Sequence, residues 1–249
     1  RKTLLIDTDG MVTAQVNALT VLENGDICFG LPSRITATAR MGDGKIIDIE
    51  RETDLSGALH SKGVMILTAY LTSTFQPHKA FSVTATLAFE QSYAEVDGDS
   101  ASGAELCALL SAIGRLPLRQ DLALTGAVNQ FGQLQAVGGV NEKIEGFFAI
   151  CNQRGLTGRQ GVIIPQANIK NLMLEERVVA AVAEGRFHLY AVDTIEAAAA
   201  LLTGIPWDTQ DPHSDCILKR MSSRLDSYER HAAEDSTRPH WPRSPKDKA

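Results

Sequence analysis

Apolar and polar residues alternate most strictly between Lys79 and Gln91. A side chain that is apolar at every second position is typical of a strand that buries one face, so we predict a strand here. The apolar positions of this strand are Phe81, Val83, Ala85, Leu87 and Phe89. It is the clearest strand in the chain.

A helix is predicted to follow soon after that strand. Leucine and isoleucine recur at i, i+3, i+4 and i+7, which places them on one helical face, and the helix should end near Gly114 and Pro117. These residues are Leu106, Leu109, Leu110 and Ile113. Residues 96–105, Val-Asp-Gly-Asp-Ser-Ala-Ser-Gly-Ala-Glu, therefore connect a strand to a helix.

Hydrophobic periodicity and turn residues predict further strands and helices on both sides of this connection. Before it we expect strands at 12–22, 27–30, 34–39 and 45–50, with an Asn-Gly hairpin turn at 24–25, and a helix at 57–75. After it we expect strands at 122–128, 134–137, 161–165 and 187–192, and helices at 140–153, 169–183 and 194–202. Strands that alternate with helices in this way indicate an α/β fold, with helices packed on a mixed sheet.

The character of the chain changes after Trp207. Residues 214–233 have the pattern of a polar helix, and residues 239–249 are rich in proline and charge, which is typical of disorder. We therefore predict one folded domain over residues 1–207 and a polar C-terminal extension over residues 208–249.

Composition excludes several classes of protein. A formal net charge of −6 argues against a dedicated nucleic-acid binder. No apolar run approaches the roughly 18 residues that a membrane span needs. The four cysteines form no CxxC pair, so we expect no zinc site or disulfide framework and favour a reducing, cytoplasmic location. The chain has no GxxxxGK[ST] phosphate loop and begins Arg-Lys-Thr, so we expect a piece of a longer protein without its own ATPase.

The strand-to-helix connection contains two serines, for which the local sequence predicts different roles. Ser102 and Glu105 match the capping box S-x-x-E, in which both side chains would satisfy free backbone donors. Ser100 would then stand before the helix, where backbone N–H groups could stabilise an oxyanion and Gly98 would allow a close approach. The segment G-x-S-x-S does not match the G-x-S-x-G elbow. The local pattern leaves open both a plain helix start and a nucleophilic Ser100.

Lys143 is a candidate base for that serine. It falls at the edge of an apolar stripe on the helix predicted at 140–153. Such a lysine commonly buries its stem and extends its ammonium group into water. Alternatively, burial could lower its pKa by about 3 from ~10.4, so that a neutral amine could accept the Ser100 proton. Asp97 and Asp99 would oppose this shift in pKa unless they point away.

Together these segments resemble the proteolytic domain of Lon peptidases. Residues 97–102, Asp-Gly-Asp-Ser-Ala-Ser, resemble the nucleophile motif of the Lon-B branch. Residues 125–126, Thr-Gly, and 138–143, Gly-Gly-Val-Asn-Glu-Lys, resemble the downstream motifs that end in the catalytic lysine. Residues 60–64, His-Ser-Lys-Gly-Val, resemble another family segment, although a lone histidine there more often caps or packs a helix than binds a ligand. The likeness covers about residues 12–207 and is greatest to the Lon-related ATP-dependent proteases of gammaproteobacteria.

The resemblance implies the fold and the roles of site residues. The expected fold is the two-layer, ribosomal-protein-like α/β fold of Lon proteolytic domains. Ser100 would be the nucleophile, Lys143 the general base, and Thr125 would orient the lysine amine. The oxyanion would be bound by backbone N–H groups between Asp97 and Ser100, which include those of Gly98 and Asp99. Ala127 departs from the Thr-Gly-Glu that many Lon sequences carry, so a role for that carboxylate is not expected here.

The resemblance also implies how the protein would work. We expect a serine endopeptidase that degrades unfolded polypeptides as a hexameric ring, driven by ATP and Mg²⁺ at an AAA+ ATPase outside this chain. No metal or cofactor is expected in the chain itself. The alternative is a catalytically silent module that only assembles a ring. A nucleic-acid-binding domain of similar build is disfavoured by the acidic balance and by the lack of a basic–aromatic surface pattern.

Overall fold

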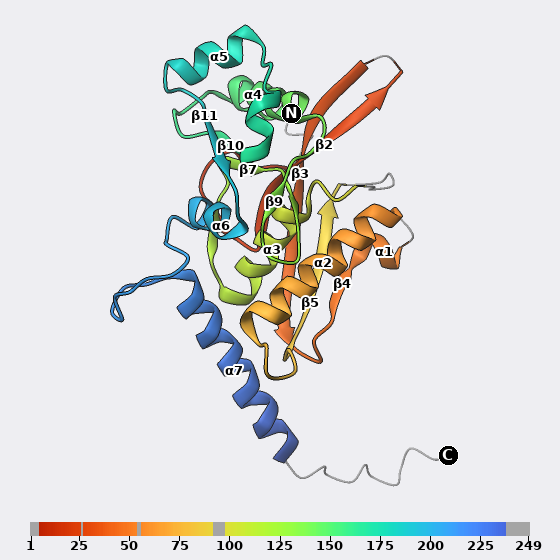
Figure 1. The fold of residues 1–249 in the computed structure, drawn as a ribbon, viewed down its shortest axis with the longest axis vertical. Coiled ribbons are helices and arrows are strands. Elements are labelled where there is room, and N and C mark those ends of the chain that lie inside the picture. Colours follow the sequence, from red (N-terminus) through yellow and green to blue (C-terminus); the bar gives the residue numbers. More distant parts are fainter. Residues whose placement is uncertain (1–4, 26, 54–55, 92–97, 238–249) are drawn as a thin grey trace.

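The computed structural model of the chain describes residues 5–25, 27–53, 56–91 and 98–237 (Figure 1). Within these residues a seven-stranded sheet forms the centre, in the strand order β11-β10-β7-β2-β3-β5-β4. Its strands are β2 (Gln15–Asn24), β3 (Ile27–Met41), β4 (Ile46–Asp48), β5 (Val83–Glu90), β7 (Leu122–Leu124), β10 (Gly161–Pro165) and β11 (His188–Val192). The pairs β2–β3 and β3–β5 are antiparallel and the other neighbours are parallel, so the sheet is mixed.

Helices and two short ladders surround this sheet. The helices are α1 (Ile49–Glu52), α2 (Ala58–Phe75), α3 (Ser102–Gly114), α4 (Val140–Arg154), α5 (Glu176–Ala183), α6 (Ile195–Thr203) and α7 (Ile217–Thr237), with a 3₁₀ turn at Gln166–Asn171. The ladders pair β1 (Met11–Thr13) with β6 (Pro117–Arg119) and β8 (Ala127–Val128) with β9 (Leu134–Gln135). Across the described part of the chain, we find no helix with both the length and the apolarity needed to cross a membrane.

Both faces of the sheet are covered. Successive residues of a strand point to opposite faces, so Ile163 of β10 enters one hydrophobic cluster while Val162 and Ile164 enter the other. The first cluster contains residues from α2, α3, α6 and α7, and the second contains residues from α4 and α5. This arrangement confirms the predicted α/β class, in which helices pack on a mixed sheet.

Several predicted elements are confirmed closely. The alternating strand is β5, and its apolar positions Val83, Ala85, Leu87 and Phe89 are all buried. The predicted helices at 57–75 and 140–153 are α2 and α4. These segments share a strong periodicity along the sequence, which is the signal that local reasoning detects best.

The strands predicted at 27–30 and 34–39 are wrong as separate elements, because they form one continuous strand, β3. Pro32, at the predicted break, pairs with Leu19 of β2. On the other side of β3, the pairing with β5 begins only at Arg34. Among the described residues, Pro32 therefore occupies a part of β3 that has a strand on one side only, where a missing N–H is tolerated.

Three other predictions are wrong for reasons that lie elsewhere in the chain. The strand predicted at 45–50 ends at Asp48, since Glu50 turns inward in α1 and accepts the Phe89 N–H. The strand predicted at 122–128 breaks at Gly126, whose N–H donates to Ser100 instead of to a strand. The helix predicted at 169–183 is interrupted at 172–175, where side chains of α4 accept backbone N–H groups.

The predicted polar helix of the extension is α7, which begins and ends a few residues later than expected. Its residues Ile217, Met221 and Leu225 are buried in the same core as α3. The domain boundary at 207 stays a prediction. The predicted disorder of residues 239–249 lies outside the described residues.

Candidate active site

Ser100 and Lys143 meet in the folded chain. The Lys143 Nζ donates a hydrogen bond of 3.0 Å to the Ser100 Oγ. Ser100 lies in the connection that leads into α3, and Lys143 lies in the first turn of α4. Because the two residues are 43 positions apart, only the tertiary fold makes this contact.

The close approach of α4 to β3 sets the position of Lys143. A Cβ atom added to Gly146 of α4 would lie 2.1 Å from the carbonyl oxygen of Gly30 in β3. No side chain fits at this distance, so glycine on both elements allows the two backbones to touch. Lys143 lies one helical turn before Gly146 and is 3% exposed.

Burial changes the chemistry of Lys143. Its surroundings lower the pKa of the amine to about 8, because burial penalises the charged form more than the charges of Asp99 and Glu142 favour it. Between Lys143 and Asp99, which are both described, there is no ion pair within 4.0 Å. Asp97 lies outside the described residues. The interpretation that the ammonium reaches out into water is therefore wrong, and a neutral amine is accessible.

The backbone of Ser100 is held by the loop between β7 and β8. Its carbonyl oxygen accepts the Gly126 N–H at 2.9 Å and the Thr125 hydroxyl at 3.3 Å. The Gly103 N–H in turn donates to the Gly126 carbonyl at 3.0 Å. The Thr125 hydroxyl thus holds the backbone of the serine, and its predicted role in orienting the lysine amine stays a prediction.

The predicted capping box is wrong. The residue before α3 is Ala101, and no side chain caps the helix. The Ser102 Oγ instead accepts the Val128 N–H at 2.9 Å, which joins α3 to β8. Glu105 is 1% exposed and faces His60. Ser102 is therefore a buried structural residue, and this leaves Ser100 as the serine of the connection that can act on a ligand.

The start of α3 narrows the choice of oxyanion donors. The N–H groups of Ser102 and Gly103 donate to the carbonyls of Asp99 and Gly126, so neither can bind an oxyanion. Gly98 has φ +103°, a conformation that favours glycine. The oxyanion role of the N–H groups of Gly98, Asp99 and Ser100 stays a prediction, and the part of it that concerns Asp97 lies outside the described residues.

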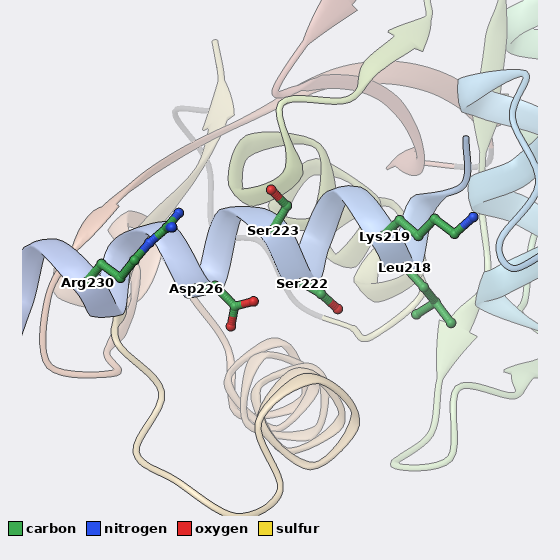
Figure 2. A pocket seen from close by; sticks show the side chains of 6 residues that line it. All are labelled: Leu218, Lys219, Ser222, Ser223, Asp226 and Arg230. Carbon is green, nitrogen blue, oxygen red and sulfur yellow. The ribbon is translucent and has the colours of Figure 1, made fainter. Parts of the chain in front are cut away.

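A hollow on the surface of α7 lies apart from this pair. Figure 2 shows the side chains along it, and all of them come from α7. They are Leu218, Lys219, Ser222, Ser223, Asp226 and Arg230. Helix α7 meets α3 where Met221 contacts Gly114, which is the end of α3 away from Ser100. The hollow therefore contributes nothing to the Ser100–Lys143 site.

The sequence of this chain matches a known protein family and several curated proteins. Residues 61–202 match the family described as the Lon protease (S16) C-terminal proteolytic domain. The chain is 53% identical over 207 residues to a Lon protease homolog of Escherichia coli (strain K12), which covers 82% of this chain and 35% of that protein. It is 48% identical over 223 residues to a Lon protease homolog of Haemophilus influenzae, covering 88% of this chain and 37% of that protein. An archaeal Lon protease of Thermococcus kodakarensis is 28% identical over 226 residues, which is 90% of this chain and 32% of that protein. The chain thus spans about a third of the length of these curated relatives.

Proposed function

This chain belongs to the Lon protease (S16) C-terminal proteolytic domain family, and from that premise we propose that it is a serine endopeptidase module with a Ser100–Lys143 dyad. Ser100 is the nucleophile and Lys143 the general base. The observation that carries the proposal is the 3.0 Å hydrogen bond from the buried Lys143 Nζ to the Ser100 Oγ. A nucleophile and base within hydrogen-bond reach are what this chemistry requires.

The lowered pKa of Lys143 supports its role as a base. With a pKa of about 8, roughly one lysine in ten is neutral at pH 7. An ordinary lysine near 10.5 would be neutral in roughly one molecule in three thousand. Burial therefore supplies the amine that can accept a proton near neutral pH.

The reaction follows from these two groups. Neutral Lys143 takes the Ser100 proton as Oγ attacks the carbonyl carbon of the scissile peptide. The C–N bond then breaks, and the protonated lysine donates its proton to the leaving amine, which leaves an acyl group on Ser100. Lys143, neutral again, takes a proton from water as the water oxygen attacks the ester carbonyl carbon. The ester C–O bond then breaks, and the lysine returns the proton to the Ser100 Oγ, which releases the carboxyl product and regenerates both residues.

Backbone groups beside Ser100 complete the proposed site. The tetrahedral intermediate carries its negative charge on the former carbonyl oxygen, and one well-placed donor lowers the barrier by about 3 kcal/mol. We assign this task to backbone N–H groups at Gly98, Asp99 and Ser100. Thr125 acts as a positioning residue, since its hydroxyl and the Gly126 N–H both hold the Ser100 carbonyl.

The partners that we propose rest on family membership. The substrates are unfolded polypeptides, and the working form is a hexameric ring in the cytoplasm. ATP and Mg²⁺ act at an AAA+ domain outside this chain. The chain covers about a third of each curated relative, which is consistent with a proteolytic domain here and an ATPase domain in another part of the full-length protein.

The test compares Ser100→Ala and Lys143→Ala with the parent in the full-length protein, with hydrolysis of an unfolded substrate as the readout. We expect both variants to lose activity, while Ser222→Ala and Lys45→Ala, at exposed positions far from the pair in sequence, should match the parent. Parental activity in either dyad variant would show that the assignment is wrong. A parent that assembles a ring but hydrolyses nothing would favour the silent assembly module.

A further inference from the structure

Four ionisable side chains that the peptidase mechanism does not use are buried together; we call Asp48, Glu50, His60 and Glu105 the carboxylate–histidine cluster. Each is at most 5% exposed. They come from the end of β4, from α1, from the start of α2 and from the first turn of α3. Three acids around one imidazole at this depth must be neutralised by protons or by a cation, because an unpaired buried charge costs several kcal/mol.

The polar atoms inside the cluster lack hydrogen-bond partners. The His60 Nε2 lies 3.1 Å from the Asp48 Oδ2, which is ion-pair distance, and the charge of Asp48 helps to raise the pKa of His60. Among the described residues, both Asp48 carboxylate oxygens, the Glu50 Oε2 and the His60 Nε2 have no hydrogen-bond partner. Native proteins rarely leave so many buried polar atoms unpaired, so each requires an explanation.

Three residues of the cluster offer metal-ligand atoms that lie close to one another. One donor atom from each of Asp48, Glu50 and His60 lies within 4.8 Å of the other two. Ligands that share a zinc-like ion at about 2.1 Å stand roughly 3 to 3.6 Å apart, so modest movement would bring all three to the ion. Glu50 is already oriented, because its other oxygen accepts the Phe89 N–H at 2.8 Å.

We propose that Asp48, Glu50 and His60 bind one divalent transition-metal ion of the zinc or manganese class. Two carboxylates and an imidazole suit these ions, whereas Ca²⁺ and Mg²⁺ prefer oxygen ligands alone. The bound cation would supply positive charge to the buried acids in place of protons. The site is formed by residues outside the dyad, and its existence does not depend on the proposed peptidase activity.

Glu105 faces the ring nitrogen of His60 that points away from Asp48. Its Oε1 lies 3.6 Å from the His60 Nδ1, opposite the nitrogen that faces Asp48. A metal-binding histidine usually donates its other N–H to a carboxylate, which fixes the ring and its tautomer. At 3.6 Å the contact is not yet a hydrogen bond, and the Glu105 Oε1 has no hydrogen-bond partner among the described residues. A small turn of the ring on metal binding would close this gap, so we assign Glu105 as a positioning residue for His60 and do not count it as a ligand.

The ion would link the end of β4 and α1 to α2, beside the start of α3. Glu105 lies in the first turn of α3, and its N–H donates to Ala101, next to Ser100. On α2, a Cβ at Gly63 would contact Asp99 and Ser102. Metal binding at His60 would thus hold α2 against the start of α3, and the ion would stabilise the fold beside the dyad.

The experiment measures metal binding by the full chain and does not require activity. The protein is stripped with a chelator, and Zn²⁺ is then titrated against a chromophoric competitor in a Cys28→Ser background, because Cys28 is an exposed thiol. We expect one Zn²⁺ per chain, a rise in Tm with Zn²⁺ concentration, and visible d–d absorption when Co²⁺ replaces Zn²⁺. A folded parent chain that binds less than one equivalent, with the cluster neutralised by protons alone, overturns the proposal.

Variants locate the site. Asp48→Asn and His60→Gln should abolish stoichiometric binding, and Glu105→Gln should weaken it about 10- to 100-fold. The control is His78→Gln, at an exposed histidine, which should bind as the parent does. Circular dichroism checks that each variant folds, and if the ligand variants do not fold, Glu105→Gln decides. Unchanged Zn²⁺ affinity in a folded His60→Gln or in Glu105→Gln shows that the ion binds elsewhere and overturns the proposal.

Discussion

Gly30 of β3 and Glu142 of α4 lie in backbone contact, at a distance that leaves no room for a side chain. A Cβ added to Gly30 would lie 2.0 Å from the Glu142 carbonyl oxygen and 2.7 Å from the Lys143 Cα. The lysine that meets Ser100 is thus placed by a glycine more than a hundred residues earlier in the chain. The geometry of the dyad depends on this crossing of helix and strand.

The first prediction follows from that contact. Gly30→Ala should push α4 away from β3, lower the free energy of unfolding by about 1–3 kcal/mol and reduce kcat/KM about 10- to 100-fold. Denaturant titration and peptidase assays measure the two effects. Gly138→Ala is the matched control, because a Cβ there meets nothing within 4 Å. Parental kcat/KM in Gly30→Ala would show that the crossing does not position Lys143.

The pH dependence of activity reports the protonation of Lys143. Since burial lowers its pKa to about 8, kcat/KM should rise with pH and level off above that value. Lys143→Arg should be inactive throughout the range, because arginine stays protonated. A rising limb governed by a group near 10 would contradict the proposal of a desolvated base.

Lys143 should also cost stability near neutral pH. Its native pKa of about 8 lies below the ordinary value of 10.5, so the unfolded chain binds more protons between these pH values and stability rises with pH there. At pH 7 the burial cost is about 3 kcal/mol, partly offset by about 1 kcal/mol from the hydrogen bond to Ser100. Lys143→Met should therefore raise Tm at pH 7, and the advantage should shrink as the pH rises from 8 to 10.5. A Lys143→Met variant that is less stable than the parent at pH 7 would refute this account.

Alanine substitutions of Ser100, before α3, and of Ser102, within α3, should differ in their effects on hydrolysis and on stability. Ser102→Ala leaves the buried Val128 N–H without its acceptor and should cost about 1–3 kcal/mol of unfolding free energy. Ser100→Ala should abolish hydrolysis and lower the unfolding free energy by about 1 kcal/mol, because the buried Lys143 amine loses its bond to the serine. Calorimetry and substrate hydrolysis on both variants test the pair. Loss of hydrolysis in Ser102→Ala together with parental hydrolysis in Ser100→Ala would show that the two roles are assigned to the wrong serines.

Local patterns predicted much of the fold and part of the site. The alternation before residue 91 predicted β5, and helical spacing predicted α2, α3 and α4, because each pattern lies within one element. The capping-box prediction is wrong although the sequence matches the motif, because the Ser102 hydroxyl accepts the Val128 N–H and does not cap its own helix. His60 was expected to cap or pack, because nothing near it in sequence shows that Asp48 and Glu105 face it.

By itself, the sequence determined the α/β class, the strand-to-helix connection that presents Ser100, and, through motif resemblance, Lys143 as its partner. Only the tertiary structure decided that the lysine is buried, that Thr125 holds the serine backbone, and that four ionisable groups share one interior site. The physical reason is that periodicity reports which face of an element is buried. A pKa, a hydrogen-bond partner or a shared ion depends on atoms that distant segments bring within a few ångströms of each other.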